Sequence, residues 1–265
     1  MKKLKDTTII IPVAIESTDR LNNAKTVLGF LNYHFNVNVI IHELVKGETK
    51  LDFLGDYKNL RINHIIEQND LTTYHRTRQL NEMLNKVTTK VVVNYDIDVL
   101  LPVETYIEAE KMIILGKSDV VYPYGNGLYQ KRIFTKFNRE RFDNVFDFNL
   151  ITEGDYDIWY AKYGHCVFLN TSKYRRCGGE NEGFIAYGPE DSERYERFVK
   201  IGYKVDRVND IVYHLEHSRT SFSDNTNHNF KKNDILYEKL SKMTKDEIID
   251  YYYNIEYKNK YKAKN

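Results

Sequence analysis

The sequence has little cysteine, proline or tryptophan and no long hydrophobic run. Its two cysteines, Cys166 and Cys177, are too few for a disulfide framework and do not form a C-x-x-C pair, which is typical of buried small side chains in a reducing compartment. The longest apolar stretches, residues 8–15 and 91–95, are far shorter than the ~18 residues that a membrane-spanning helix needs. The 39 basic and 38 acidic side chains leave a net charge of +1, which argues against a protein that mainly binds nucleic-acid backbones.

A chain of 265 residues is long enough for one large domain with an ordinary hydrophobic core. Its basic first residues run directly into a strand-like segment, without the apolar region of a signal peptide. We therefore expect a cytoplasmic protein that contacts a membrane peripherally at most.

Short β-branched runs alternate with segments of helical period from residue 7 to residue 121, the pattern of β-α-β units around a mainly parallel sheet. We predict strands at residues 7–13, 37–44, 61–67, 90–95, 119–122 and 165–170 and within 205–217, with Pro12 ending the first. We predict helices from Ser17, around Leu80, at 103–115, before Gly178, after Pro189 and after Thr244. The expected fold class is α/β, with helices flanking a central sheet.

Residues 125–160 lack clear periodicity, and we interpret them as an insertion or a long loop region. The chain shows no internal repeat and no flexible linker. We expect one domain at residues 1–220, with a nucleotide-binding half at 1–124 and an acceptor and catalytic half at 125–220. A helical extension at 221–265 follows it.

Asp96 and Asp98 follow the apolar strand at 90–95, and their two-residue spacing puts both carboxylates on one side of an extended chain. Ligands of open α/β sheets bind beyond the carboxyl ends of the strands, where this pair falls. Two carboxylates placed together favour a bound cation. The alternative is an ordinary turn, where aspartate is common.

His214 and His217 follow another strand-like segment, and a three-residue gap on a turn can bring both imidazoles toward one metal ion. The alternative is one core histidine and one surface histidine. Together with the aspartate pair, they form a mixed ligand set that suits Mn²⁺, with Mg²⁺ as a weaker candidate.

Acidic residues gather at the start of the helix after Pro189, where Glu190, Asp191 and Glu193 complement the helix dipole. A carboxylate here can also act as a general base, and the sequence does not rank Glu190 against Asp191. Arg76 lies near the start of an earlier helix, a geometry that suits phosphate oxygens, although a solvated polar face is the alternative.

Five motifs occur in an order that resembles the GT-A glycosyltransferases, in particular the beta-1,4-galactosyltransferase group and its bacterial relatives. They are TIIIPV at 8–13, HRTRQLN at 75–81, YDIDVLLP at 95–102, GGENEGFIAYGPED at 178–191 and HLEHSR at 214–219. The chain departs from the family pattern at Ala186 and Tyr187, which replace tryptophans, and at Ser192, which interrupts an acidic run.

The resemblance implies an inverting transfer of a hexose or N-acetylhexosamine from a UDP-sugar to a hydroxyl of a glycan or lipid-linked glycan. Galactose and N-acetylgalactosamine are favoured, and the expected role is in bacterial surface polysaccharide synthesis. The resemblance implies that Asp98 and His217 bind Mn²⁺, with His214 at the position of a sulfur ligand in the family. It implies that Asp191 is the base and that Glu190 holds the acceptor or donor sugar. The nucleotide-binding residues it implies are Pro12, Val13, Arg20, Glu43, Arg76, Asp96 and Asp98.

Two other hypotheses stay open on the sequence. One is a non-catalytic module of the same fold that binds sugar nucleotides or glycans, and the other is a sugar nucleotidyltransferase or metal-dependent phosphohydrolase that uses Asp96 and Asp98. No nucleic-acid partner is expected. Peripheral membrane contact would come from a tail of aromatic and basic residues: Tyr251, Tyr252, Tyr253, Tyr257, Lys258, Lys260, Lys262 and Lys264. The alternative interpretation of this tail is a helical cap.

Overall fold

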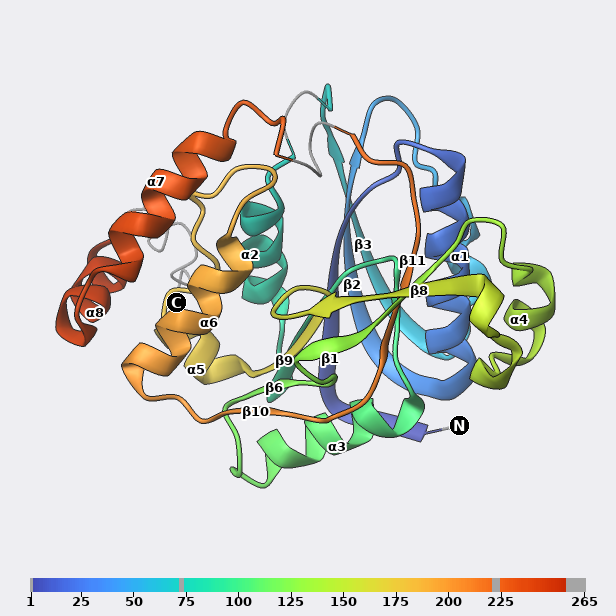
Figure 1. The fold of residues 1–265 in the computed structure, drawn as a ribbon, viewed down its shortest axis with the longest axis horizontal. Coiled ribbons are helices and arrows are strands. Elements are labelled where there is room, and N and C mark those ends of the chain that lie inside the picture. Colours follow the sequence, from blue (N-terminus) through green and yellow to red (C-terminus); the bar gives the residue numbers. More distant parts are fainter. Residues whose placement is uncertain (1, 72–73, 221–224, 256–265) are drawn as a thin grey trace.

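The computed structural model describes residues 2–71, 74–220 and 225–255. Its centre is a seven-stranded sheet with the order β10-β6-β9-β4-β1-β2-β3 (Figure 1). The strands are β1 (Lys2–Ala14), β2 (Phe35–Val45), β3 (Leu60–Gln68), β4 (Val91–Tyr95), β6 (Val120–Tyr122), β9 (Cys166–Asn170) and β10 (Val205–Arg207). Neighbouring strands are parallel except at β9, which is antiparallel to both β4 and β6. The predicted α/β fold with a mainly parallel sheet is confirmed.

Helices cover both faces of this sheet because successive side chains of its buried strands point to opposite faces. On β4, Tyr95 stacks on Tyr106 of α3 (Val103–Ile114), and Phe30 of α1 (Thr18–His34) packs beside the same ring. The neighbouring Asn94 points the other way and binds Tyr174 of α5 (Thr171–Arg176). The helices α2 (Arg76–Lys86) and α6 (Glu190–Ile201) also lie on that second face.

The first strand extends past Pro12, contrary to the expectation that this proline ends it. β1 pairs with β4 only from Thr7 to Ile10, whereas its pairing with β2 continues to Ala14. Pro12 therefore pairs with β2 and lies beyond the ladder with β4. Proline is tolerated at such a position because it lacks the N–H that a second ladder would use.

Residues 125–160 contain more regular structure than their sequence indicates. β7 (Gly127–Ile133) and β8 (Tyr156–Ala161) join β5 (Val99–Leu100) and β11 (Val212–Leu215) in a second sheet of order β5-β11-β7-β8. Between β7 and β8 lie α4 (Arg139–Val145) and the short 3-10 helices η2 (Phe148–Leu150) and η3 (Glu153–Asp155), while a further 3-10 helix, η1 (Asp52–Asp56), precedes β3. The prediction of a loop region was wrong because both faces of β8 are largely exposed, so no alternation of apolar and polar residues marks the strand.

The C-terminal segment forms two helices, α7 (Phe230–Ser241) and α8 (Lys245–Asn254), which lie against α6 at one end of the molecule (Figure 1). Thr244 and Glu247 form the predicted capping box at the start of α8, and α7 lies within the expected helical extension, although the sequence did not give its bounds. Phe184, Leu240, Ile248 and Tyr252 form a separate small hydrophobic cluster. Among the described residues, every helix is too short or too polar to span a bilayer.

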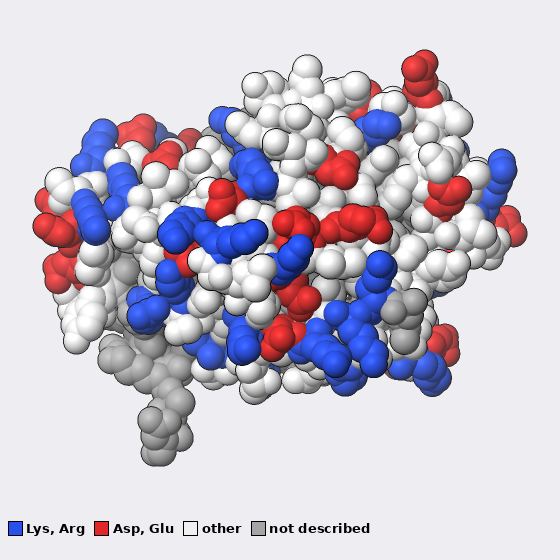
Figure 2. All heavy atoms as spheres, turned by 90° about the horizontal axis from the view of Figure 1, so that it is seen from below, with Lys and Arg blue, Asp and Glu red and all other residues white. Residues whose placement is uncertain are grey.

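The burial of Tyr252 corrects one expectation for the tail, since a side chain that is 2% exposed does not contact a lipid surface. Tyr253, by contrast, is 76% exposed. The other tail residues named above, Tyr257, Lys258, Lys260, Lys262 and Lys264, lie outside the described residues. Figure 2 shows basic and acidic side chains close to one another over one face, as the balanced composition implies.

We predict that Tyr252→Phe lowers the free energy of unfolding by about 1–2 kcal/mol, because the buried Asn181 and Glu193 each lose a hydrogen bond to its hydroxyl. Urea denaturation of the full chain measures this change. Tyr253→Phe is the matched control on the same helix, with an expected change within about 0.5 kcal/mol. Equal effects of the two substitutions would contradict the assignment.

Candidate active site

A cavity of about 540 Å³ lies beyond the carboxyl ends of β1 and β4. Because these strands are parallel neighbours, the segments that follow them meet at one edge of the sheet, the usual ligand position in open α/β folds. Ten of the residues singled out in the sequence line this cavity: Pro12, Val13, Arg20, Arg76, Asp96, Asp98, Glu190, Asp191, His214 and His217. The fold thus brings together residues from five separated motifs.

Glu43 is the predicted nucleotide-binding residue that does not line the cavity. Its fully buried carboxylate accepts hydrogen bonds from Thr49 Oγ1 and from the backbone N–H of Lys50, and it contacts His64 Nε2 at 3.0 Å. These contacts hold the loop after β2 against β3.

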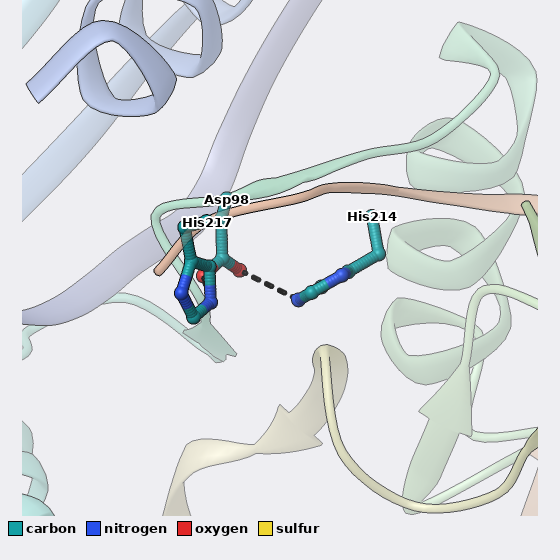
Figure 3. A group of neighbouring side chains, drawn as sticks. All are labelled: Asp98, His214 and His217. Carbon is teal, nitrogen blue, oxygen red and sulfur yellow. Dashed lines mark ion pairs between the residues drawn. The ribbon is translucent and has the colours of Figure 1, made fainter. Parts of the chain in front are cut away.

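Asp98 and two histidines form a compact cluster at the cavity wall (Figure 3). Asp98 Oδ2 lies 3.1 Å from His217 Nε2, and its Oδ1 lies 3.7 Å from His214 Nε2. The short pairing of β5 with β11 sets this arrangement, since His214 is opposite Val99 and the Leu215 N–H donates to the Asp98 carbonyl. One oxygen and two nitrogen donors, all within 4.8 Å of one another, fit a divalent cation.

The protonation states of His214 and Asp98 also suit metal binding, whereas burial of His217 is outweighed by its hydrogen bond to Asp98, which raises the pKa of His217. Burial lowers the pKa of His214 to about 4, so its imidazole is neutral at neutral pH, and its Nδ1 is buried without a hydrogen-bond partner among the described residues. Burial opposes ionisation of Asp98, but the nearby His214 and His217 more than offset it and lower the pKa of Asp98. A neutral imidazole and an ionised carboxylate are the forms that coordinate metals.

Asp96 has a different partner from Asp98, because the chain forms a turn between β4 and β5 and is not extended as expected. Asp96 Oδ1 accepts a hydrogen bond from Arg76 Nη2 at 2.7 Å. Arg76 Nη1 lies 3.7 Å from Asp191 and 3.9 Å from Glu190. The guanidinium of Arg76 therefore links Asp96 to Glu190 and Asp191 on α6.

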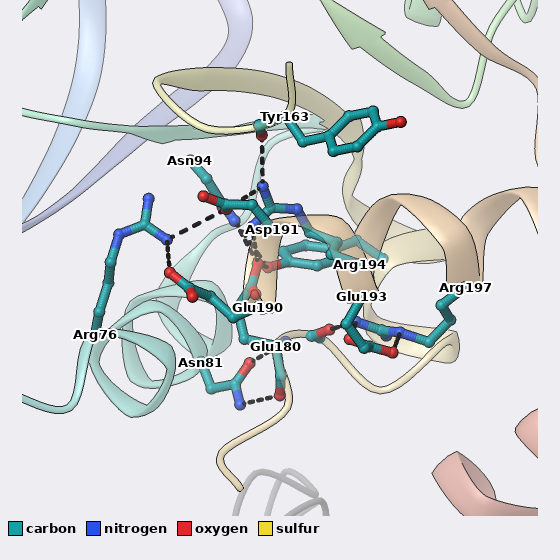
Figure 4. A network of polar contacts seen from close by, with 12 residues as sticks. Arg76, Asn81, Asn94, Tyr163, Glu180, Glu190, Asp191, Glu193, Arg194 and Arg197 are labelled. Atoms are coloured by element: carbon teal, nitrogen blue, oxygen red, sulfur yellow. Dashed lines mark hydrogen bonds and ion pairs between the residues drawn. The ribbon is translucent and has the colours of Figure 1, made fainter. Parts of the chain in front are cut away.

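The second residue of the acidic pair at the start of α6, Asp191, is held by a buried arginine (Figure 4). Arg194, one turn further along the helix, is 1% exposed and donates to Asp191 Oδ1 at 2.6 Å and to Glu180 Oε1 at 2.8 Å. Glu180 is itself fully buried and accepts hydrogen bonds from Asn94 and Tyr174. The position of Asp191 thus depends on a polar network that reaches into the central sheet.

The two carboxylates of this pair differ in acidity. Burial, and after it the negative charge of Asp191, raises the pKa of Glu190 to about 8. Burial alone would raise the pKa of Asp191, but the positive charges of Arg194 and Arg76 outweigh it and lower that pKa. At neutral pH the site therefore holds a protonated Glu190 beside an ionised Asp191, an arrangement typical of functional carboxylate pairs.

Several further residues line the cavity, and the sequence reasoning did not single them out. Arg132 on β7 is one, and it lies in the region interpreted as a loop. Arg132 Nη2 lies 2.7 Å from Asp157 Oδ2, and the guanidinium carbon lies 4.4 Å from the centroid of the Trp159 ring. The indole N–H of Trp159 donates to the same Asp157. The spacing of Asp191 and Arg194 on one helix face is a signal that would have revealed Arg194.

His165, which precedes β9, also lines the cavity. Its backbone has the left-handed φ of +67°, and its carbonyl accepts a hydrogen bond from the Asp96 N–H at 2.9 Å. Burial lowers the pKa of His165. Nothing in the local sequence signals this conformation, because glycine is the residue that normally adopts it.

A second carboxylate and histidine cluster lies outside the cavity. His42, Glu67 and Glu82 also place ligand atoms within 4.8 Å of one another. Here Arg78 donates to Glu67 at 2.6 Å and to Glu82 at 2.8 Å. Because one guanidinium bonds to both carboxylates, these contacts fasten α2, which carries Arg78 and Glu82, to β2 and β3, which carry His42 and Glu67.

Comparison with known proteins agrees with this geometry. The family model described as the N-terminal domain of galactosyltransferase matches residues 148–218, a segment that carries the acidic pair and both cavity histidines. No curated protein matches the chain in sequence. Similar solved structures include S. aureus TarS 1-349 in complex with UDP-GlcNAc, with a TM-score of 0.56, 13% identity, and coverage of 94% of this chain and 72% of that one.

The chain has the GT-A fold of glycosyltransferases. The mannosyltransferase PcManGT from Pyrobaculum calidifontis, in complex with GDP-Man and Mn²⁺, has a TM-score of 0.50 at 16% identity over 80% of this chain. A further structure of S. aureus TarS 1-349 has a TM-score of 0.50 at 13% identity over 79% of this chain. This chain spans 56% and 60% of the length of those two proteins. The structural likeness shows the fold, and the family match covers the segment that carries the acidic pair and both cavity histidines.

The raised pKa of Glu190 predicts how stability depends on pH. A carboxyl whose pKa is higher in the folded than in the unfolded chain stabilises the fold at low pH, and this contribution is lost as pH rises toward the folded value of about 8. We expect the free energy of unfolding of the native protein, relative to that of Glu190→Gln, to fall from about pH 5 to about pH 9. Urea denaturation of both proteins at several pH values measures the difference, and a difference that is constant with pH would contradict the prediction.

Proposed function

We propose that this protein is a metal-dependent, inverting glycosyltransferase that moves a hexose or N-acetylhexosamine from a UDP-sugar to an acceptor hydroxyl. The observation that carries the proposal is the composition of one cavity, which is lined both by the Asp98, His214 and His217 cluster and by the ionised Asp191. Transfer of a sugar from a diphosphate needs both groups, because negative charge develops on the leaving diphosphate while the acceptor must lose a proton.

The metal that we propose is Mn²⁺, with Mg²⁺ as the second candidate. Asp98, His214 and His217 would hold it, and when bound it would offset the charge of the diphosphate. The ligand set supports Mn²⁺ over Mg²⁺ because imidazole nitrogens suit the softer ion and Mg²⁺ prefers oxygen.

The nucleotide would lie along the end of β1. Pro12, Val13 and Arg20 line the cavity there, and Asp96 and Arg76, which bond to each other, also line it. Arg76 Nη1 is buried without a hydrogen-bond partner among the described residues, although two carboxylates lie within ion-pair distance. An unsatisfied guanidinium N–H at a cavity wall supports a role in binding phosphate oxygens.

Asp191 is the base that we propose, and its ionised state at neutral pH supports this choice over Glu190. Asp191 Oδ1 is bonded to Arg194, which leaves Oδ2 to take the proton of the acceptor hydroxyl. The acceptor oxygen then bonds to the anomeric carbon as the bond from that carbon to the diphosphate breaks, and UDP leaves. The protonated Glu190 can donate a hydrogen bond to a sugar oxygen while this happens.

The proposal extends to the identity of the sugar and of the acceptor. The match to the galactosyltransferase family favours galactose or N-acetylgalactosamine as the transferred sugar. A glycan or lipid-linked glycan is the acceptor that we propose, in bacterial surface polysaccharide synthesis, on the resemblance to bacterial relatives of that group.

Removal of the metal or of its carboxylate ligand tests the first half of the site. We expect EDTA to abolish UDP release from a UDP-sugar and added Mn²⁺ to restore it, and Asp98→Asn to lower turnover by about 100-fold or more, because several kcal/mol of charge stabilisation is lost. Glu82→Gln, the same change in the His42 cluster, is the matched control and should keep native metal dependence. Turnover that is indifferent to both EDTA and Asp98→Asn would overturn the metal role.

Paired substitutions of the acidic residues test the second half. We expect Asp191→Asn to lower kcat by about 10²–10⁴-fold with little change in the affinity for UDP and Mn²⁺, since the base acts in the chemical step. Glu190→Gln should retain clearly more turnover, because glutamine can still donate a hydrogen bond. Steady-state kinetics and calorimetric titration of UDP measure the two effects. The reverse order of the two variants would assign the base to Glu190, and UDP binding without turnover in the native protein would indicate a binding module.

A further inference from the structure

Two residues of the cavity wall have a backbone conformation that costs free energy. Among the described residues other than glycine, Leu71, Phe146, His165 and Ala186 have positive φ, and the last two line the cavity. A residue with a Cβ is strained in this region, so a histidine there needs a compensating reason. Strained residues of this kind gather at functional sites.

The hydrogen bonds around His165 hold the strained turn in place. Its carbonyl accepts from Asp96 N–H at 2.9 Å, and the carbonyl of Gly164 accepts from the N–H of Cys166 at 2.9 Å and from the hydroxyl of Tyr124. All these hydrogen bonds are made to backbone carbonyls, so a glycine at position 165 would keep them. The backbone requirement therefore does not explain why the chain has an imidazole here.

The imidazole itself has a fixed orientation. His165 Nε2 lies 3.0 Å from Oε1 of Gln130, a residue of β7 that is 7% exposed. Because an amide oxygen only accepts, Nε2 carries the proton and donates it, and Nδ1 is left as a hydrogen-bond acceptor. The ring centroid lies 5.6 Å from those of both Tyr124 and His214.

The turn at residues 164–165 borders both halves of the site. On one side is His214 of the metal-binding cluster. On the other side, the preceding Gly164 is so close to the acidic pair that a Cβ added to it would lie 3.2 Å from Asp191 Oδ2. In an in-line displacement the sugar occupies the space between the leaving diphosphate and the acceptor oxygen, and residues 164–165 border that space.

We propose that His165 contacts the transferred sugar of the donor and determines selectivity between sugar epimers, with Nδ1 accepting a hydrogen bond from one sugar hydroxyl. This assignment rests on the proposed function. A fixed acceptor rewards the epimer whose hydroxyl points toward it and leaves the other epimer unpaired, which is how a polar group in a buried site discriminates strongly. Gln130 is a positioning residue, since it acts through the ring.

The test uses His165→Gly in the full chain, with Mn²⁺ and two epimer pairs of donors: UDP-glucose with UDP-galactose, and UDP-N-acetylglucosamine with UDP-N-acetylgalactosamine. We expect the ratio of kcat/KM between the preferred donor and its epimer to fall about tenfold or more. The affinity for UDP alone should change less than about twofold, because UDP lacks the sugar. The melting temperature should change little, since the left-handed conformation that glycine adopts freely offsets the lost hydrogen bond to Gln130.

Two further variants separate backbone from side chain. His165→Asn keeps a polar residue that tolerates the left-handed region but places its acceptor nearer the backbone, and it should also lose selectivity. Ala186→Gly is the thermal reference, because it relieves the same kind of strain while removing one methyl group.

An epimer ratio that survives His165→Gly would overturn the inference, as would an equal loss of affinity for UDP and for UDP-sugars. The proposed function fails separately, when the native protein transfers no sugar from any of the four donors. In that case the affinities of the native and variant proteins for the two members of an epimer pair still test the role of His165, since binding needs no turnover.

Discussion

The rest of the site depends on the ion pairs and hydrogen bonds that the buried guanidinium of Arg194 makes. This guanidinium joins Glu180, Asp191 and the carbonyl of Tyr163, which come from three separate segments of the chain. Glu180 in turn binds Asn94 on β4 and Tyr174 on α5, so the network continues into the core. Loss of one partner from a buried ion pair of this kind costs about 3–5 kcal/mol, because it leaves an uncompensated charge away from water. The same contacts that fix the acidic pair therefore also hold α6 to the central sheet.

The metal-binding cluster is built by a different principle. β5 has only two residues, yet its pairing with β11 brings Asp98 beside His214, which lies far from it in the sequence. Arg76 then connects the two halves of the cavity, because it contacts Asp96 at the end of β4 and both carboxylates on α6. A change in charge at either half thus acts on the other through one side chain.

The sequence predicted the central sheet well because its strands are nearly continuous apolar runs, as in Ile9 to Val13 and Val91 to Val93. The sequence also identified ten residues that line one cavity in the structure. It could do so because ligand-binding sites of open α/β sheets lie at the carboxyl ends of the strands. It failed for β7, whose side chains are mostly half-buried, and for β8, whose side chains are largely exposed, because neither strand shows a clear alternation of apolar and polar residues. Glu43 illustrates the limit of motif reasoning: its strand ends at the expected edge, but Thr49 and Lys50 of the following loop take up its carboxylate.

The contact between Arg132 and Trp159 has a practical consequence. Trp159 is the single tryptophan of the chain, it is 39% exposed, and one face of its ring is covered by a guanidinium that belongs to the cavity wall. Indole emission is sensitive to a nearby cation and to water, so movement of Arg132 alters the fluorescence of this ring alone. The chain therefore has a single indole fluorophore, and it lies against a residue of the cavity wall.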